Sequence, residues 1–214
     1  MVITCERKKI STIVVMYSLY LHILGLSLRN TSKTLEPFKD EKRSYVSIWN
    51  WIQRFGSLQI YKRKRVSAFI IDETVIQIGN EHFWLWICIE PVHCSVLGIY
   101  ISEKYARCWK IYLFTGWKIW QTYSVYTDGR TWYDDEACNI LRLKHYLHSP
   151  LDKSLIERVN QYFKDRIESF DDYYPCMKNE CNLFHVNNWI QFFVSMYNDT
   201  TFENYFINEL NSKG

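Results

Sequence analysis

Residues 66–102 constrain the fold most, because they contain three strand-like runs joined by short connections. Each run is rich in β-branched and aromatic residues, and the connections contain the turn-forming residues Gly79, Asn80 and Pro91. Connections this short favour strands that are neighbours in one sheet and run in opposite directions. The sequence therefore predicts an antiparallel three-stranded meander.

The first of these runs, IIDETVIQIG at residues 70–79, carries two acids, Asp72 and Glu73. Alternation along a strand places their side chains on opposite faces, each among apolar neighbours. An ionised acid in such surroundings costs roughly several kcal/mol unless it is paired, hydrogen-bonded, solvated or bound to a metal. Two interpretations follow: an exposed strand end with solvated acids, or a carboxylate that holds a metal ion.

Charge is distributed unevenly along a chain of 214 residues whose net charge is only +3. Residues 1–65 hold 13 Lys/Arg and 4 Asp/Glu, a net charge of +9, whereas residues 66–214 hold 13 and 19, a net charge of −6. The basic part ends in the run YKRKR at residues 61–65. This asymmetry suggests a module that binds a polyanion, joined to a part that uses carboxylates.

Three short helices are expected within residues 1–65, as in a helix-turn-helix domain. Ser44 can cap the third of them, residues 45–55. Its predicted inner face is Val46, Trp49, Ile52 and Phe55. Its outer face, including Ser47, Asn50 and Arg54, would enter the major groove, while Arg43 and Arg54 hold phosphates. A generic three-helix bundle with a solvated face is the simpler alternative.

Two other features of the sequence have a functional and a structural interpretation. Residues 10–28 are uncharged, as in a membrane anchor, but their scattered polar residues favour a core helix. Seven cysteines without a CxxC pair indicate a reducing cytoplasm. Cys176, Cys181 and His185 are three candidate zinc ligands without a fourth, so ordinary packing is favoured.

The second half of the chain supplies two more acids at element ends. A fourth strand, YSVYTDG, ends at Asp128, and the amphipathic helix SLIERVNQYFKDRIESF offers Glu157 and Lys164 on one side. A final apolar helix is expected in residues 181–197. Acids on a first strand, a later strand and a helix suit a pair of Mg²⁺ or Mn²⁺ ions, which prefer oxygen ligands.

This order of motifs resembles the DDE transposases of bacterial and archaeal insertion sequences. It is most similar to their replicative, cointegrate-forming family, which has a ribonuclease H-like integrase core, and the resemblance covers about residues 17–197. It implies that Asp72, Asp128 and Glu157 are the catalytic triad that binds two metal ions. By position, Lys164 would hold DNA near them, and Trp132 would stack on or wedge a flipped base.

The resemblance also implies the architecture and the activity. Residues 1–65 would be an all-α helix-turn-helix domain with a basic linker, and residues 66–214 a ribonuclease H-like catalytic domain, a mixed sheet flanked by helices. Water would cut one strand at the terminal inverted repeat, and the freed 3′ hydroxyl would attack target DNA. The partners implied are double-stranded DNA and further copies of the chain, in a cytoplasmic, nucleoid-associated and membrane-free assembly.

One segment departs from the family. Residues 104–123 hold three tryptophans and a glycine without a helical period, where relatives have an amphipathic helix. Reverse translation of this segment, read one nucleotide on, permits such a helix, so a pair of compensating frameshifts is one hypothesis. A degenerate, inactive copy would follow from it. The alternative function is a non-catalytic DNA-binding protein that is derived from a transposase.

Overall fold

A computed structural model describes residues 10–37, 42–57, 66–103, 123–130, 143–165, 173–174 and 182–198. The chain divides into two compact units. The first unit comprises residues 1–60, 165–171 and 184–214, and the second comprises residues 61–164 and 172–183. The N-terminal segment of the first unit is residues 1–60, whereas the sequence analysis placed the boundary after residue 65. The first unit also takes in most of the C-terminal helix α8 (Leu183–Asn198), which the sequence analysis assigned to the catalytic domain.

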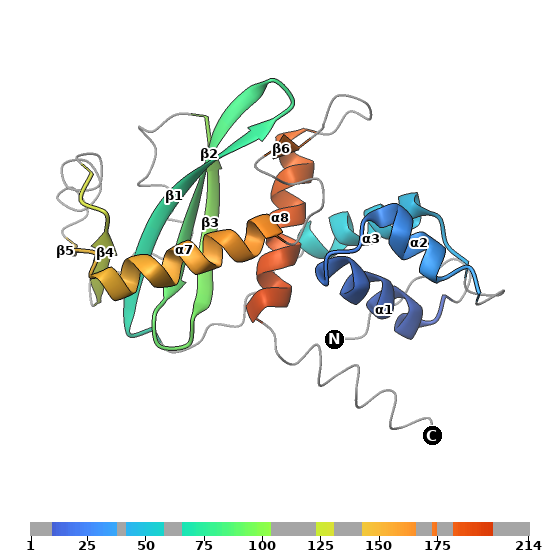
Figure 1. Ribbon diagram of the computed structural model, residues 1–214, viewed down its shortest axis with the longest axis horizontal. Helices are drawn as coiled ribbons and strands as arrows, with labels where there is room; N and C mark the ends of the chain where they lie inside the picture. Colours follow the sequence, from blue (N-terminus) through green and yellow to red (C-terminus); the bar gives the residue numbers. More distant parts are fainter. Residues whose placement is uncertain are drawn as a thin grey trace. The chain divides into compact units, whose positions relative to one another are not determined.

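The first unit begins with the three predicted helices, α1 (Thr12–Ile23), α2 (Leu28–Thr34) and α3 (Tyr45–Ser57), which pack against one another (Figure 1). The short connection between α1 and α2 contains Gly25, whose φ of 104° suits glycine. The connection from α2 to α3 covers residues 35–44 and is longer than the turn of about 3–4 residues in a compact helix-turn-helix. Ser44 caps α3 as predicted, because its Oγ accepts a hydrogen bond from the Ser47 N–H at 3.3 Å.

The predicted inner face of α3 is partly wrong. Its buried side chains are Ile48, Trp51 and Ile52, whereas Val46 is exposed. The physical reason is a second partner, α8. The Gln53 side chain donates to the His185 carbonyl at 3.1 Å and accepts from the Asn188 amide at 3.2 Å, so α3 also buries the side that meets α8.

At Gly56 the backbone of α3 passes close to α8, and replacement of this glycine by alanine is expected to destabilise the protein by about 2–4 kcal/mol. A Cβ added there would lie 1.7 Å from the Asn188 carbonyl oxygen, so the two helices would have to separate. Urea unfolding, monitored by circular dichroism, measures the loss in the free energy of unfolding. Ser57→Ala, at the exposed end of the same helix, is the control. If Gly56→Ala instead gained the roughly 1 kcal/mol that alanine gives an open helix position, α8 would not pack there.

The second unit contains a mixed sheet. Strands β1 (Ala68–Ile78), β2 (Glu81–Glu90) and β3 (Ser95–Ser102) form the predicted antiparallel meander. Strand β4 (Ser124–Thr127) runs parallel to β1, and β5 (Lys144–Leu147), which the sequence analysis missed, runs parallel to β4. The resulting order, β3-β2-β1-β4-β5, is ribonuclease H-like, so the predicted fold class is confirmed. A short strand β6 (Tyr173–Tyr174) pairs with the end of β1.

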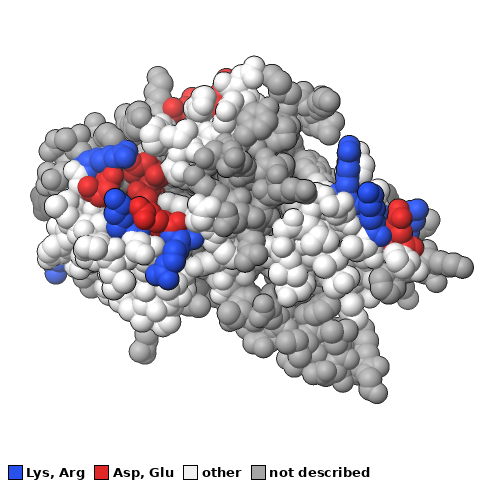
Figure 2. Space-filling model, viewed as in Figure 1, with Lys and Arg blue, Asp and Glu red and all other residues white. Residues whose placement is uncertain are grey.

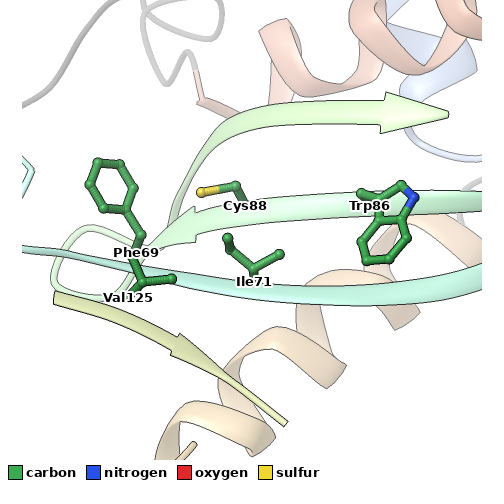
Figure 3. Packing of buried hydrophobic residues seen from close by; sticks show 5 residues of the cluster. All are labelled: Phe69, Ile71, Trp86, Cys88 and Val125. Carbon is green, nitrogen blue, oxygen red and sulfur yellow. The ribbon is translucent and has the colours of Figure 1, made fainter. Parts of the chain in front are cut away.

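Buried side chains on one face fix β4 beside β1. Figure 3 shows this cluster, in which Phe69 and Ile71 of β1 lie with Trp86, Cys88 and Val125 of the adjoining strands. Helix α7 (Pro150–Asp165) crosses the sheet (Figure 1) and buries Ile156, Val159 and Phe163. The carboxyl end of β4 is therefore held next to the middle of β1, where Asp72 lies.

The uncharged segment at residues 10–28 forms only the short helix α1 before the turn at Gly25. Among the residues that the structure describes, no helix combines the length and the apolar character that crossing a bilayer requires. The anomalous segment at residues 104–123 lies, except for Tyr123, outside the described residues.

Candidate metal centre

Three carboxylates meet at one end of the sheet. One oxygen each of Asp72, Glu73 and Asp128 lies within 4.8 Å of the others. The pairing of β1 with β4 explains the meeting of the two aspartates: Ile70 is opposite Tyr126, and each aspartate lies two residues further along, Asp72 within β1 and Asp128 just past the end of β4. The structure thus brings together two of the three acids that the sequence analysis selected.

Glu73 joins this cluster although it was not predicted as a site residue. On this side β1 pairs with β4 at residues 68–70 and with β6 at residues 77–78, so Asp72 and Glu73 lie between the two pairings. Alternation starts the two side chains on opposite faces, and the longer side chain of Glu73 reaches Asp128 beyond the end of β4. The Glu73 side chain is only 1% exposed. The pair of adjacent acids, Asp72 and Glu73, was the sequence signal that could have identified Glu73 as a site residue.

Arg130 bridges two of the acids. Its Nη1 lies 2.7 Å from Oε1 of Glu73, and its Nε lies 2.7 Å from Oδ2 of Asp128. Figure 2 shows basic and acidic atoms side by side over the region where Figure 1 draws β4 and α7. This centre therefore contains one positive charge among its carboxylates.

Asp72 lies on the face that meets α7, because its Oδ2 accepts a hydrogen bond from Nδ2 of Asn160 at 3.2 Å. Burial raises the pKa of Asp72 to about 7, and the negative charges of Glu73 and Asp128 raise it further than Arg130 lowers it. Near pH 7 this group therefore carries a proton for much of the time. A bound cation would release that proton, since metal ligands must be deprotonated.

Helix α7 presents Asn160, not Glu157, to the cluster. The Glu157 side chain is 59% exposed, and its Oε1 lies 3.9 Å from Nζ of Lys153. Asn160 is one turn further along the same flank, and its Oδ1 is buried without a hydrogen-bond partner in the described part of the chain. Because the terminal amide torsion of asparagine is broad, Asn160 can also turn its Oδ1 toward Asp72.

Two histidines that the sequence analysis did not single out hold the end of β4 in place. The His145 ring shares a hydrogen bond with the Thr127 hydroxyl at 2.7 Å. The His148 backbone N–H donates to the Thr127 carbonyl at 2.7 Å, and its Nε2 lies 3.1 Å from the Tyr126 carbonyl. Burial lowers the pKa of His148, which favours the neutral ring. These contacts fix the strand end from which Asp128 projects.

The residues of this centre fit a hard divalent cation. Carboxylate and amide oxygens are the ligands that Mg²⁺ and Mn²⁺ prefer. The oxygen of Asn160, which is buried without a partner among the described residues, and the raised pKa of Asp72 are both features that a cation would relieve. Asp72 and Asp128 would be its first ligands, with Glu73 and Asn160 within reach.

The other predicted site residues are placed as follows. Lys164 lies in α7, but its side chain lies outside the described residues, as do Trp132, Cys176 and Cys181. On α3, Asn50 and Arg54 are exposed one turn apart, and Ser47 and Arg43 are half-buried. Figure 2 shows basic side chains over these N-terminal helices. The His185 ring packs on Trp49, with ring centroids 5.1 Å apart.

The comparisons with known proteins give similarity to an archaeal protein and to solved structures from retroviral integrases. No family model matches it. An uncharacterized protein of Methanocaldococcus jannaschii is 27% identical over 185 residues, which cover 83% of this chain and 82% of that protein. Among solved structures, the HTLV-2 integrase catalytic core domain in complex with magnesium is similar with a TM-score of 0.41 and 14% identity, over 61% of this chain and 86% of that chain. A chain in the structure of the simian T-cell lymphotropic virus intasome in complex with PP2A regulatory subunit B56 gamma is similar with a TM-score of 0.39 and 15% identity, over 82% of this chain and 67% of that chain.

Proposed function

We propose that this chain is a DDE transposase, a metal-dependent polynucleotidyl transferase that cuts and joins strands of double-stranded DNA at the ends of an insertion sequence. One observation carries the proposal. Asp72 and Asp128, which are far apart in the sequence, project from neighbouring strands β1 and β4 of a ribonuclease H-like sheet into one acidic cluster. Convergent carboxylates of this kind suit the binding of catalytic divalent cations.

In this proposal the chain's own residues hold the cations and the DNA. Asp72 and Asp128 bind Mg²⁺ or Mn²⁺, with Glu157 of α7 as the third acid. Two such ions would supply activation of the attacking hydroxyl and stabilisation of the leaving oxygen. Lys164 and Trp132 hold the strand that is cut.

The duplex is bound elsewhere in the chain. Ser47, Asn50 and Arg54 of α3 contact the bases of the terminal inverted repeat, and Arg43 and Arg54 contact phosphates. The exposure of Asn50 and Arg54 on one side of α3 supports these roles. A homodimer or a larger assembly in the cytoplasm, at the nucleoid, holds two element ends together.

The test is metal-dependent nicking of a supercoiled plasmid that carries the DNA flanking the gene. The full chain is expected to produce nicked circles with MgCl₂ or MnCl₂ and none with EDTA. Asp72→Ala is expected to abolish the nicking, whereas Glu81→Ala, an exposed acid at the start of β2, is expected to keep it. Nicking that survives Asp72→Ala would not depend on the acidic cluster and would contradict the proposal.

A second function, that of a non-catalytic DNA-binding protein that keeps the N-terminal helices, also has support. Glu157 lies outside the acidic cluster, and Arg130 occupies two of the acids. Retention of the plasmid in a gel without any nicking, in MgCl₂ and in MnCl₂, would favour this function over the first.

A further inference from the structure

Arg130 contacts more carboxylate oxygens of the candidate metal centre than the basic residue of an ordinary surface ion pair would. Its backbone N–H donates to Oδ1 of Asp128 at 3.2 Å, and its Nε lies 2.7 Å from Oδ2, so a single residue contacts both oxygens of that carboxylate. Its Nη1 reaches Oε1 of the buried Glu73. One guanidinium therefore joins two of the three acids.

The backbone around Arg130 prepares this arrangement. Gly129 adopts a φ of 79°, which turns the chain sharply after Asp128, and its N–H donates to the Thr127 hydroxyl at 3.3 Å. A side chain at position 130 is thereby directed back over the carboxylates. The planar guanidinium fork then matches two acceptors at once, which a lysine ammonium cannot do with the same geometry.

A divalent cation and this guanidinium compete for the same place. Both are positive, and a cation bound to the oxygens of Asp128 would lie within a few ångströms of the Arg130 side chain. The guanidinium stabilises the acids while no metal is bound, and 49% of its side chain is exposed, so it can swing outward into solvent.

We propose that Arg130 is the resident counter-ion of the metal-free centre, and that a divalent cation binds by displacing it from Asp128 and Glu73. This inference rests on the proposed metal-binding function. Metal affinity is then set by an exchange of cations and not by the carboxylates alone. The protein would bind metal more weakly than its acid count implies.

The test is a titration of the full-length, metal-free protein with MnCl₂, measured by isothermal titration calorimetry. Arg130→Gln is expected to bind Mn²⁺ about tenfold more tightly than the wild type, which corresponds to the loss of two partly exposed ion pairs. Arg130→Lys is expected to stay closer to the wild type because it keeps the charge. Arg158→Gln, which removes the same charge from an exposed position of α7, is expected to leave the affinity unchanged.

The outcomes separate this inference from the proposed function. Equal or weaker Mn²⁺ binding by Arg130→Gln would overturn the inference, because Arg130 would then position the carboxylates and not compete for them. The metal centre itself would stand in that case. Absence of saturable binding in the wild type and in Arg130→Gln, with circular dichroism showing both folded, would overturn the metal centre and the inference with it.

Discussion

Replacing Asp72 by asparagine is expected to abolish Mn²⁺ binding and, at the same time, to stabilise the metal-free protein by about 1–3 kcal/mol at pH 8. Folding raises the pKa of this carboxyl from 3.8 to about 7, chiefly through burial, so the folded state favours the protonated form. The contribution of Asp72 to stability is therefore fully present below pH 4 and is lost as the pH rises through 7. Asparagine stays neutral and still offers an oxygen to the Asn160 amide.

Thermal unfolding in EDTA across pH measures this effect. The melting temperatures of the wild type and Asp72→Asn should agree near pH 4 and separate between about pH 4 and pH 7, with the variant higher. Glu81→Gln, at an exposed position of β2, should follow the wild type throughout. A less stable Asp72→Asn at pH 8 would mean that donors hold the ionised carboxylate in the folded protein, and that no metal is needed to compensate it.

A gain in stability on removing a functional group is the mark of a site maintained for binding. The same linkage predicts how metal affinity depends on pH: below about pH 7 the cation must displace the proton of Asp72, so affinity rises with pH and levels off above that value. Stability and metal affinity thus depend on the same proton, with opposite signs.

Local sequence patterns predicted most of the helices and strands. They did not predict features that depend on contacts between segments far apart in the sequence. Alternation and turn residues placed the β1–β3 meander, and Ser44 placed the start of α3. The inner face of α3 was partly wrong because α8, more than a hundred residues later, packs against it. Strand β5 was missed because it has four residues, mostly exposed, and depends on β4 for its hydrogen bonds.

The candidate site was likewise predictable only where local patterns determine it. Asp72 and Asp128 were predictable because parallel neighbouring strands bring equivalent positions to one edge. Glu73 was not predictable as a site residue. Strand alternation places its side chain on the face opposite Asp72, and it does not predict that a long side chain can reach past the end of β4 to Asp128. Asn160 was hidden because its role depends on which flank of α7 meets Asp72. These are matters of side-chain reach, which sequence spacing does not determine.

The second large effect is expected at Glu157: Glu157→Gln should lower the rate of metal-dependent plasmid nicking about a hundredfold, with little change in the melting temperature in EDTA. Glu157 is paired only loosely with Lys153, at 3.9 Å on an exposed helix face. Such a pair contributes roughly 0.3–0.5 kcal/mol, so a cation at Asp72 and Asp128 can recruit Glu157 at little cost.

The position of Glu157 on α7 makes this recruitment feasible. It lies one turn before Asn160, and residues three apart on a helix have Cβ atoms roughly 5–6 Å apart. Since Asn160 already contacts Asp72, a rotamer change brings the longer Glu157 side chain toward the same oxygens. Glu81→Gln is the matched control for charge. If Glu157→Gln nicks DNA at the wild-type rate while Asp72→Ala does not, the third acid of the centre is Glu73, and α7 contributes only Asn160.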